Sequence, residues 1–255
     1  MSDPRVSSIS VFFPAYNDAP SIARLVADAF RTVRGLAADY EVIVVNDGSH
    51  DNTAEVLSLL EQEYRPHMRV VTHEVNRGYG AALRSGFAAA RKDWVFYTDG
   101  DGQYDVRELP KLTDLAGTDV GLVNGYKLER KDPQHRIWIG NTYNAFARAL
   151  FRIRIRDIDC DFRLIRRALL DEIQLKSTSG TICVELVRKL ELSGWGVREV
   201  GVHHFERLHG RSQFFRVRSL LTTLAQLITL WVKVGLSDSK QKAQKGLNSL
   251  FDPQP

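Results

Sequence analysis

The chain has 255 residues, of which 44% are hydrophobic and 26% charged, as in soluble globular proteins that can bury a sizeable core. The formal net charge is +4, from 35 basic and 31 acidic residues, so charge alone indicates no nucleic-acid partner. No uncharged apolar run reaches the ~18 residues of a membrane-spanning helix, and the two cysteines form no CxxC pair.

Short apolar runs rich in β-branched and aromatic residues alternate with segments of helical periodicity in the first half of the chain. The expected strands are Ile9–Phe13, Glu41–Val45, Arg69–Thr72, Trp94–Thr98 and Val120–Val123. The expected helices between them are Ser21–Gly35, Thr53–Tyr64 and Tyr79–Ala90. This alternation predicts an α/β fold with a mostly parallel central sheet flanked by helices.

Each of these strands runs into a polar or turn-forming cluster. The clusters are Pro14–Asp18, Asn46–Asp51, His73–Gly80, Asp99–Asp105 and Asn124–Lys127. Because ligands of parallel sheets bind beyond the carboxyl ends of the strands, the five clusters predict one cleft.

The second half of the chain is more basic, and its pattern is less regular. Helices are expected at Thr142–Leu150, Arg166–Ile173 and Val184–Leu192, and a strand at Val197–His204. A long helical pattern follows from Phe214 to Leu236, and residues 237–255 have the composition of a frayed tail.

The segment Asp99-Gly100-Asp101 follows an apolar strand directly. Two carboxylates separated by one glycine can turn toward the same ion, and oxygen ligands suit Mg²⁺ or Mn²⁺. A solvated acidic turn is the alternative. The strand in front of the pair and the other polar clusters favour the metal site.

Two further clusters suit a nucleotide. Asp47 ends a buried strand before a glycine turn, where it can bind a ribose or base or can stabilise the turn. Gly78 and Gly80 stand at a helix start, where the backbone can approach an anion, although a tight turn has the same pattern.

Four segments, taken in order, resemble the motifs of family 2 glycosyltransferases with the GT-A fold. They are Phe13–Asp18, Val44–Ser49, Asn76–Gly80 and Asp99–Asp101, and the resemblance extends roughly over residues 8–213. It implies that the nucleotide of a sugar donor is held by Pro14, Tyr16, Asp18, Asp47, Arg77 and Gly78. It places Asp99 and Asp101 at the metal and diphosphate, with Gln103 as a further ligand.

The sequence departs from the commonest family pattern at two positions. Asp18 replaces the usual Glu, and Asn46 replaces the usual first Asp. Both keep hydrogen-bonding capacity, so the base remains open between uracil and guanine.

Two segments of the second half, Asp157–Leu164 and Glu206–Gln213, are similar to polyprenyl-phosphate glycosyltransferases such as dolichyl-phosphate mannosyltransferase. By that resemblance, Arg163, Arg207 and Ser212 help to hold acceptor and donor phosphates. Lys127 stands where the family often has Arg. Gln213 stands where the family often has Lys, and Arg211 supplies the positive charge that is missing there.

We therefore expect inverting, metal-dependent transfer of a sugar from a UDP- or GDP-linked nucleotide-sugar to a polyprenyl phosphate at the membrane surface. A lipid monophosphate is already an anionic nucleophile at neutral pH, so no strong general base is required. Transfer to a saccharide hydroxyl would need one, and Asp159 or Asp161 stands where related enzymes place it. A nucleotide-sugar-binding protein without turnover is a further alternative.

The organisation expected from these patterns is a catalytic domain at 1–213, an amphipathic helix at 214–236 and a flexible tail at 237–255. An apolar stripe with Leu220, Leu224 and Trp231 makes the helix suitable for a membrane interface, although packing on the core or in a dimer gives the same pattern. The N-terminal MSDPRVSS has no apolar signal region, which favours a cytoplasmic protein peripheral to the inner face of the membrane. Sugar, base, lipid length, preferred metal and homo-oligomer formation are left open.

Overall fold

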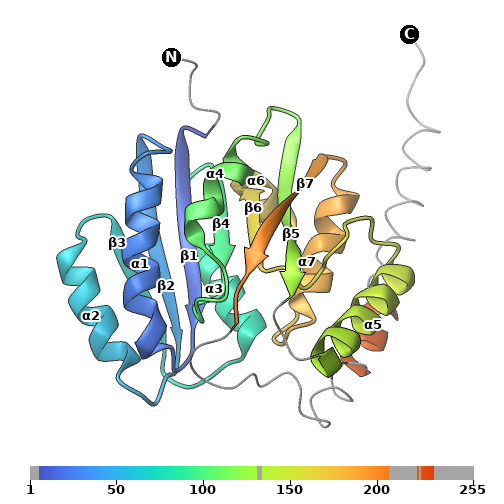
Figure 1. The fold of residues 1–255 in the computed structure, drawn as a ribbon, viewed down its shortest axis with the longest axis horizontal. Coiled ribbons are helices and arrows are strands. Elements are labelled where there is room, and N and C mark those ends of the chain that lie inside the picture. Colours follow the sequence, from blue (N-terminus) through green and yellow to red (C-terminus); the bar gives the residue numbers. More distant parts are fainter. Residues whose placement is uncertain (1–5, 131–133, 207–222, 224, 233–255) are drawn as a thin grey trace, which may run out of the picture. The chain divides into compact units, whose positions relative to one another are not determined.

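The computed structural model describes residues 6–130, 134–206, 223 and 225–232 (Figure 1). The strands are β1 (Ser8–Ala15), β2 (Asp39–Asp47), β3 (Met68–His73), β4 (Trp94–Thr98), β5 (Val120–Arg130), β6 (Phe162–Arg166) and β7 (Gly196–His204). The helices are α1 (Ala19–Val33), α2 (Thr53–Glu63), α3 (Tyr79–Ala89), α4 (Leu109–Thr113), α5 (Gln134–Phe151), α6 (Arg167–Glu172) and α7 (Ile182–Leu192), with the 3₁₀ turn η1 (Val106–Glu108) before α4.

Seven strands within the described residues form one sheet in the order β3-β2-β1-β4-β6-β5-β7. β6 is antiparallel to both of its neighbours, β4 and β5, whereas the other adjacent pairs are parallel. The carboxyl ends of β1 to β5 therefore lie at one edge of the sheet, and β6 begins there. This arrangement confirms the predicted α/β architecture with a mostly parallel sheet.

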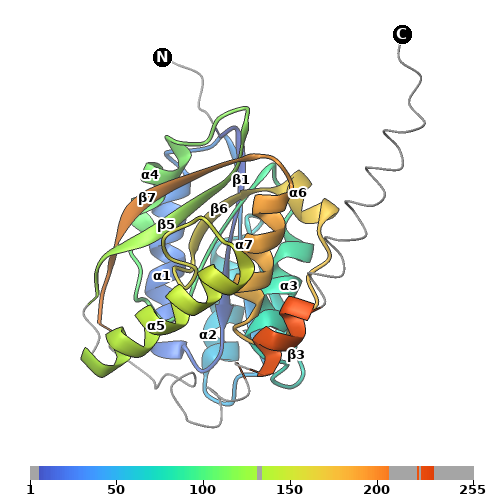
Figure 2. The same cartoon turned by 90° about the vertical axis from the view of Figure 1, so that its right-hand side faces the viewer.

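Alternating residues of the central strand face opposite helical layers. Val11 and Phe13 of β1 belong to the core that also contains Val26 of α1 and side chains of α2 and α4. Phe12 points to the other face, where its ring packs against Phe87 of α3 at 5.1 Å between centroids. Helices α3 and α7 lie on this second face (Figure 2). Both faces of the sheet are therefore covered, which explains the nearly continuous apolar run of β1.

Strand β6 is the main correction to the elements predicted from sequence. The segment Asp157–Leu164 was expected only to precede a helix, but Phe162–Arg166 forms a strand between β4 and β5. Its sequence places Arg163 inside an apolar run, which hides the strand signal. In the fold that arginine is fully buried, at 0% exposure. Strand β5 also extends to Arg130, well beyond the expected end at Val123.

The chain divides into two compact units, Met1–Ser212 and Gln213–Pro255. In the second unit, residues 225–232 are helical, within the helix expected at 214–236. Leu227 and Leu230 are buried, and Ile228, Trp231 and Val232 are about half exposed. The remaining residues of that expected helix, apart from Thr223, and the tail 237–255 lie outside the described residues. No helix in the described part of the chain combines the length and the apolar character needed to cross a bilayer.

Candidate functional site

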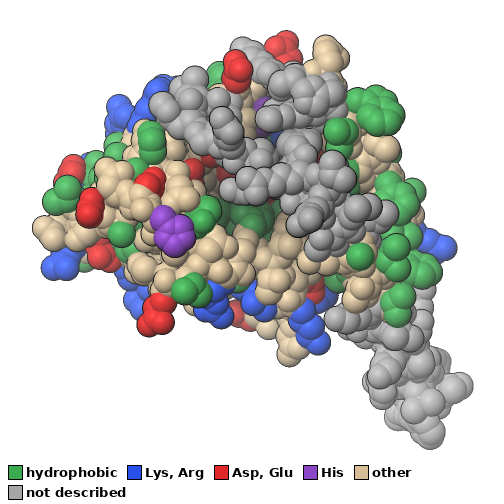
Figure 3. Space-filling view, turned by 90° about the horizontal axis from the view of Figure 1, so that it is seen from below, with side chains coloured by type: hydrophobic (Ala, Val, Ile, Leu, Met, Phe, Trp, Pro, Cys, Tyr) green, Lys and Arg blue, Asp and Glu red, His purple; other side chains and the backbone are tan. Residues whose placement is uncertain are grey.

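The carboxyl ends of β1 to β5, beyond which the sequence predicts one cleft, lie at the same edge of the sheet. Thr98 at the end of β4 pairs with Phe162 at the start of β6, so Asp99 and Asp161 flank this pair at the same edge. The strand arrowheads of β2 and β5 point to this edge at the bottom of Figure 1. The view from below shows acidic side chains distributed among hydrophobic and uncharged ones (Figure 3).

The turn after β4 carries the two predicted metal ligands. Asp99 accepts a hydrogen bond from the Tyr79 hydroxyl at 2.7 Å, and Asp101 accepts one from the backbone N–H of Gln103 at 2.9 Å. The side-chain amide of Gln103 donates to the carbonyl of Phe205 at 3.1 Å. Each carboxylate is thus oriented by a donor that is already in place.

Gly100 brings this turn close to the end of β1 and to the loop that follows it. A Cβ at Gly100 would lie 2.7 Å from the Pro14 carbonyl oxygen and 3.3 Å from Oδ2 of Asp18. Only glycine allows so close an approach of the two backbones. The structure therefore brings Asp18 together with Asp99 and Asp101, as the sequence predicts for one cleft.

The donor set of this turn fits a hard divalent cation. No group of three or more His, Cys, Asp and Glu residues in the described part of the chain is arranged to hold a metal ion. Mg²⁺ commonly takes one or two protein carboxylates and completes its shell with water and substrate phosphates. Asp99 and Asp101 offer two carboxylates beside the narrow passage at Gly100, which matches that requirement.

The loop after β1 is held by the loop after β2. Asn17, at φ 57°, accepts hydrogen bonds from the backbone N–H groups of His50 and Asp51 through its side-chain oxygen. Asp18 accepts from the N–H of Tyr16 at 2.9 Å and donates its own N–H to the Thr53 hydroxyl. These contacts fix the loop that carries Tyr16 and Asp18 against the loop after β2 and the start of α2.

Asp47 is buried, and it fastens the loop after β3. Its carboxylate accepts hydrogen bonds from Nδ1 of His73 at 2.6 Å and from the backbone N–H groups of Arg77 and Gly78, each at 2.9 Å. His73 in turn contacts the Ser85 hydroxyl through Nε2 at 2.8 Å. These contacts hold Arg77 and Gly78 of the loop after β3, whereas the stabilising role expected for Asp47 concerned the glycine turn that directly follows it.

The glycines at the start of α3 serve a contact within the protein. A Cβ on Gly78 would lie 2.6 Å from the carbonyl oxygen of Thr178, and one on Gly80 would lie 2.6 Å from that of Ser177. The N–H of Gly80 donates to the Thr178 carbonyl at 2.9 Å. The close backbone approach expected from these glycines therefore involves the connection between α6 and α7.

Arg163, expected to hold phosphates, lies in the core with four hydrogen bonds. Its guanidinium donates to Asn124 at 2.7 Å, to Asp161 at 2.5 Å, to the Tyr97 hydroxyl and to the Ile158 carbonyl. Burial raises the pKa of Tyr97 well above its usual value, so this hydroxyl stays protonated. In this arrangement Arg163 supports the segment that precedes β6, and its donors are directed to protein groups.

Lys127, expected near the substrate, has a similar role. Its side chain is 4% exposed, pairs with Asp157 at 3.3 Å and donates to the Asp159 carbonyl at 2.7 Å. Lys127 of β5 and Arg163 of β6 together therefore hold the segment 157–161.

Asp161 is the centre of a polar cluster that sequence reasoning only partly identified. Besides Arg163, it accepts from the Tyr97 hydroxyl and from the Cys183 thiol, each at 3.2 Å. Burial raises the pKa of Cys183, so the thiol stays protonated beside the carboxylate. Tyr79 and Tyr97 gave no functional signal in the sequence because aromatic residues are ordinary in strands and helices. Arg207, Arg211 and Ser212 lie outside the described residues.

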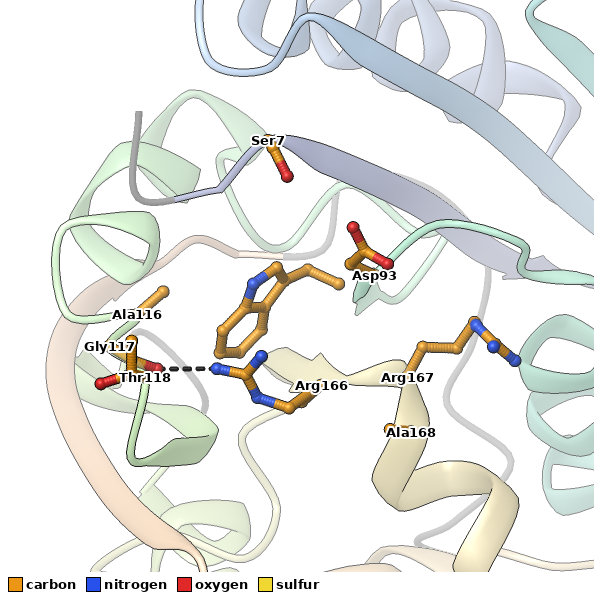
Figure 4. Close-up of a pocket in the computed structure, with 9 residues that line it drawn as sticks. Ser7, Asp93, Ala116, Gly117, Thr118, Arg166, Arg167 and Ala168 are labelled. Atoms are coloured by element: carbon orange, nitrogen blue, oxygen red, sulfur yellow. Dashed lines mark hydrogen bonds between the residues drawn. The ribbon is translucent and has the colours of Figure 1, made fainter. Parts of the chain in front are cut away.

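A separate cavity of about 470 Å³ opens at the opposite edge of the sheet (Figure 4). Its lining residues are Ser7, Asp93, Trp94, Ala116, Gly117, Thr118, Arg166, Arg167 and Ala168. Arg166 donates to the carbonyls of Gly117 and Val120, and its guanidinium lies 4.6 Å from the centroid of the Trp94 ring. None of the described site candidates lines this cavity, so it is distinct from the cleft.

Comparison with known proteins agrees with this geometry. A sequence model of glycosyl transferase family 2 matches residues 10–174. An undecaprenyl-phosphate 4-deoxy-4-formamido-L-arabinose transferase of Pseudomonas fluorescens is 30% identical over 226 residues, which are 88% of this chain and 64% of the relative. A protein of the same name from Aeromonas hydrophila is 27% identical over 90% of this chain and 69% of the relative. The chain thus spans slightly less than two thirds of the length of its Pseudomonas relative.

Among solved structures, glucosyl-3-phosphoglycerate synthase from Mycobacterium tuberculosis, in complex with Mn²⁺, UDP and glucosyl-3-phosphoglycerate, is similar with a TM-score of 0.65. The identity is 21%, and the match covers 91% of this chain and 79% of that one. This likeness confirms the GT-A fold expected from the sequence.

Proposed function

The chain belongs to glycosyl transferase family 2, and from that membership we propose that it transfers a sugar from a nucleotide-sugar to a polyprenyl phosphate at a membrane surface. The proposal depends on one observation, which is that the residues expected to bind the donor and those expected near the acceptor lie at the same edge of the sheet. Asp99 and Asp101 lie beside the loop of Asp18 on one side, and Asp161 lies across the β4–β6 pair on the other.

The donor occupies the half of the cleft formed by β1 to β4. Pro14, Tyr16, Asp18, Asp47, Arg77 and Gly78 form its nucleotide pocket, with Asp47 acting through the loop that it holds. Asp99, Asp101 and Gln103 would hold Mg²⁺ or Mn²⁺, and the glucosyl-3-phosphoglycerate synthase of the same fold was solved with Mn²⁺. Such a cation would supply positive charge where negative charge grows on the departing diphosphate.

The acceptor occupies the half formed by β5 to β7. An oxygen of the lipid phosphate attacks the anomeric carbon as the bond to the nucleoside diphosphate breaks, and this single displacement inverts the configuration. The phosphate is anionic near neutral pH, so no protein base takes a proton. In the proposal Arg207, Arg211 and Ser212 hold the phosphates, and Lys127 and Arg163 fix the backbone of the 157–161 segment. The names of the Pseudomonas and Aeromonas relatives support this acceptor.

Exposed aromatic side chains support a membrane surface as the place of reaction. On α5, Trp138 is 71% exposed and Phe146 44% exposed, and Arg152 and Arg154 just beyond this helix are exposed cations. On the helix 225–232, Trp231 is 49% exposed. Apolar rings together with Arg suit the headgroup region of an anionic membrane. We place the protein on the inner face of the membrane, in the cytoplasm.

The second candidate function is transfer to a saccharide hydroxyl. It is favoured by Asp161, whose carboxylate stands at the same edge as Asp99. A neutral hydroxyl must lose its proton during attack, and a carboxylate at this place would accept it.

The deciding experiment measures radiolabel transferred from UDP- and GDP-sugars into organic-extractable undecaprenyl phosphate, with Mn²⁺, with Mg²⁺ and with EDTA. Labelled lipid that forms only with metal is the expected result, and it identifies the sugar and the base. Metal-dependent donor turnover without labelled lipid would overturn the lipid acceptor and favour the hydroxyl acceptor with Asp159 or Asp161 as base. Absence of turnover with every donor would favour a binding protein.

A further inference from the structure

The hydroxyl of Tyr79 donates a hydrogen bond to Oδ1 of Asp99 at 2.7 Å. Tyr79 is the first residue of α3, and Asp99 follows β4, so the contact joins two predicted motifs that lie 20 residues apart. Its partner in the metal pair, Asp101, is oriented differently, by the backbone N–H of Gln103 within its own turn. Asp99 therefore has an orienting donor on a side chain from another element.

The backbone on both sides of Tyr79 is fixed. The N–H of Gly78 donates to Asp47 at 2.9 Å, and the N–H of Gly80 donates to the Thr178 carbonyl at 2.9 Å. A side chain at Gly78 would collide with that same carbonyl. Because Tyr79 stands between these two anchors, its ring has a defined position from which the hydroxyl reaches Asp99.

We propose that Tyr79 is a positioning residue that orients the Asp99 carboxylate for the divalent cation and so sets the affinity of the site for that cation. The inference rests on the proposed function, because it needs Asp99 to be a ligand. A hydrogen bond to one carboxylate oxygen restricts rotation of the group and so fixes the direction in which the carboxylate faces the ion. Loss of such outer contacts typically weakens metal binding by about 10- to 100-fold. The contact also makes cation affinity depend on the Asp47–Gly78 anchor.

The test is a direct titration of Mn²⁺, in which the electron paramagnetic resonance signal of the free ion is followed in the presence of UDP or of GDP, whichever the wild type binds. Tyr79→Phe removes only the hydroxyl and should raise the Mn²⁺ dissociation constant about 10-fold or more. Binding of the same nucleotide without metal, measured by calorimetry, and the melting temperature should stay near the wild-type values. Tyr64→Phe, at the end of α2 and away from the sheet edge, is the matched control.

Two results would overturn the inference. One is a Tyr79→Phe protein that binds Mn²⁺ as the wild type does. The other is an equal loss of metal-free nucleotide binding, which would indicate a general structural role. If the wild type itself binds no Mn²⁺ while it binds the nucleotide, the metal site of the proposed function fails together with the inference. If the wild type binds Mn²⁺ and the Tyr79→Phe protein binds it equally well, the inference alone fails and the metal site of the proposed function stands.

Discussion

The two halves of the cleft use charged residues in different ways. In the half formed by β1 to β4, the carboxylates of Asp18 and Asp101 lie in the loops after β1 and β4 and accept hydrogen bonds from backbone N–H groups two residues away. In the half formed by β5 to β7, Lys127 and Arg163 are buried and pair with carboxylates of one short segment. The first half thus presents charge at the sheet edge, whereas the second uses charge to hold its own backbone.

This difference has a physical origin. A carboxylate on a turn has backbone donors within a few residues, so its orientation costs little further structure. A buried cation must be matched by acceptors from several elements, since an unpaired one is strongly unfavourable. Substitutions in the first half should therefore reduce activity with little loss of stability, and those in the second half should reduce stability first.

The largest effect is expected from Asp101→Ala. It removes one of the two carboxylates of the proposed metal site, and electrostatic groups of this kind contribute about 10²- to 10³-fold to kcat. Sugar transfer should fall by at least that factor, while the urea midpoint changes little because the side chain lies in the turn after β4, outside the apolar core. Asp114→Ala, at an exposed position after α4, should keep wild-type transfer rates. Equal loss in both variants would remove the metal site from the proposal.

Arg163→Met tests the other half of the cleft. It should lower the free energy of unfolding by about 3–5 kcal/mol, because Asp161 and Asn124 lose their buried partner. Urea unfolding monitored by circular dichroism gives this value. Arg198→Met breaks an exposed pair with Asp119 and should cost at most about 1 kcal/mol. A stable Arg163→Met protein without transfer activity would instead return Arg163 to direct contact with phosphate.

Gly78→Ala tests the contact that joins the two halves. Gly78 has φ 91°, and a Cβ there would meet the Thr178 carbonyl at 2.6 Å, so strain and collision act together. At Gly194, φ is 86° and an added Cβ would have no atom within 4 Å, so Gly194→Ala measures the backbone strain without a collision. Gly194→Ala should cost about 1 kcal/mol, and Gly78→Ala clearly more, in the same unfolding assay. If Gly78→Ala and Gly194→Ala lower the free energy of unfolding by similar amounts, residues 177–178 move away from the added Cβ easily.

The same contrast explains what could be predicted from sequence. Strands β1 to β4, the order of their motifs and the shared edge follow from alternating apolar and polar segments. Strand β6 could not be predicted in this way, because Arg163 interrupts its apolar run. A buried arginine is stable there only because groups on neighbouring strands, such as Asn124, accept its hydrogen bonds. The Tyr79–Asp99 contact was equally out of reach, since a tyrosine at a helix start carries no sign of its partner.

The connection between α6 and α7 gives the smallest effect and depends on pH. Burial by itself raises the pKa of Glu185, but the contacts with Lys189 and with the N–H of Ser177 outweigh it, and the pKa is lowered from 4.5. A lowered carboxyl pKa stabilises the fold above the unfolded value of about 4.5, and this contribution is lost as the pH falls through the folded value. Glu185→Gln should therefore flatten the loss of stability below pH 5, with urea unfolding at pH 7, 5 and 4 as the measurement. Glu172→Gln, exposed on α6, should keep the wild-type slope. If Glu185→Gln shows the wild-type slope as well, the charge of Glu185 does not hold the α6–α7 connection in place against Gly80. The stability of the second half would then depend less on charged contacts than its buried ion pairs indicate.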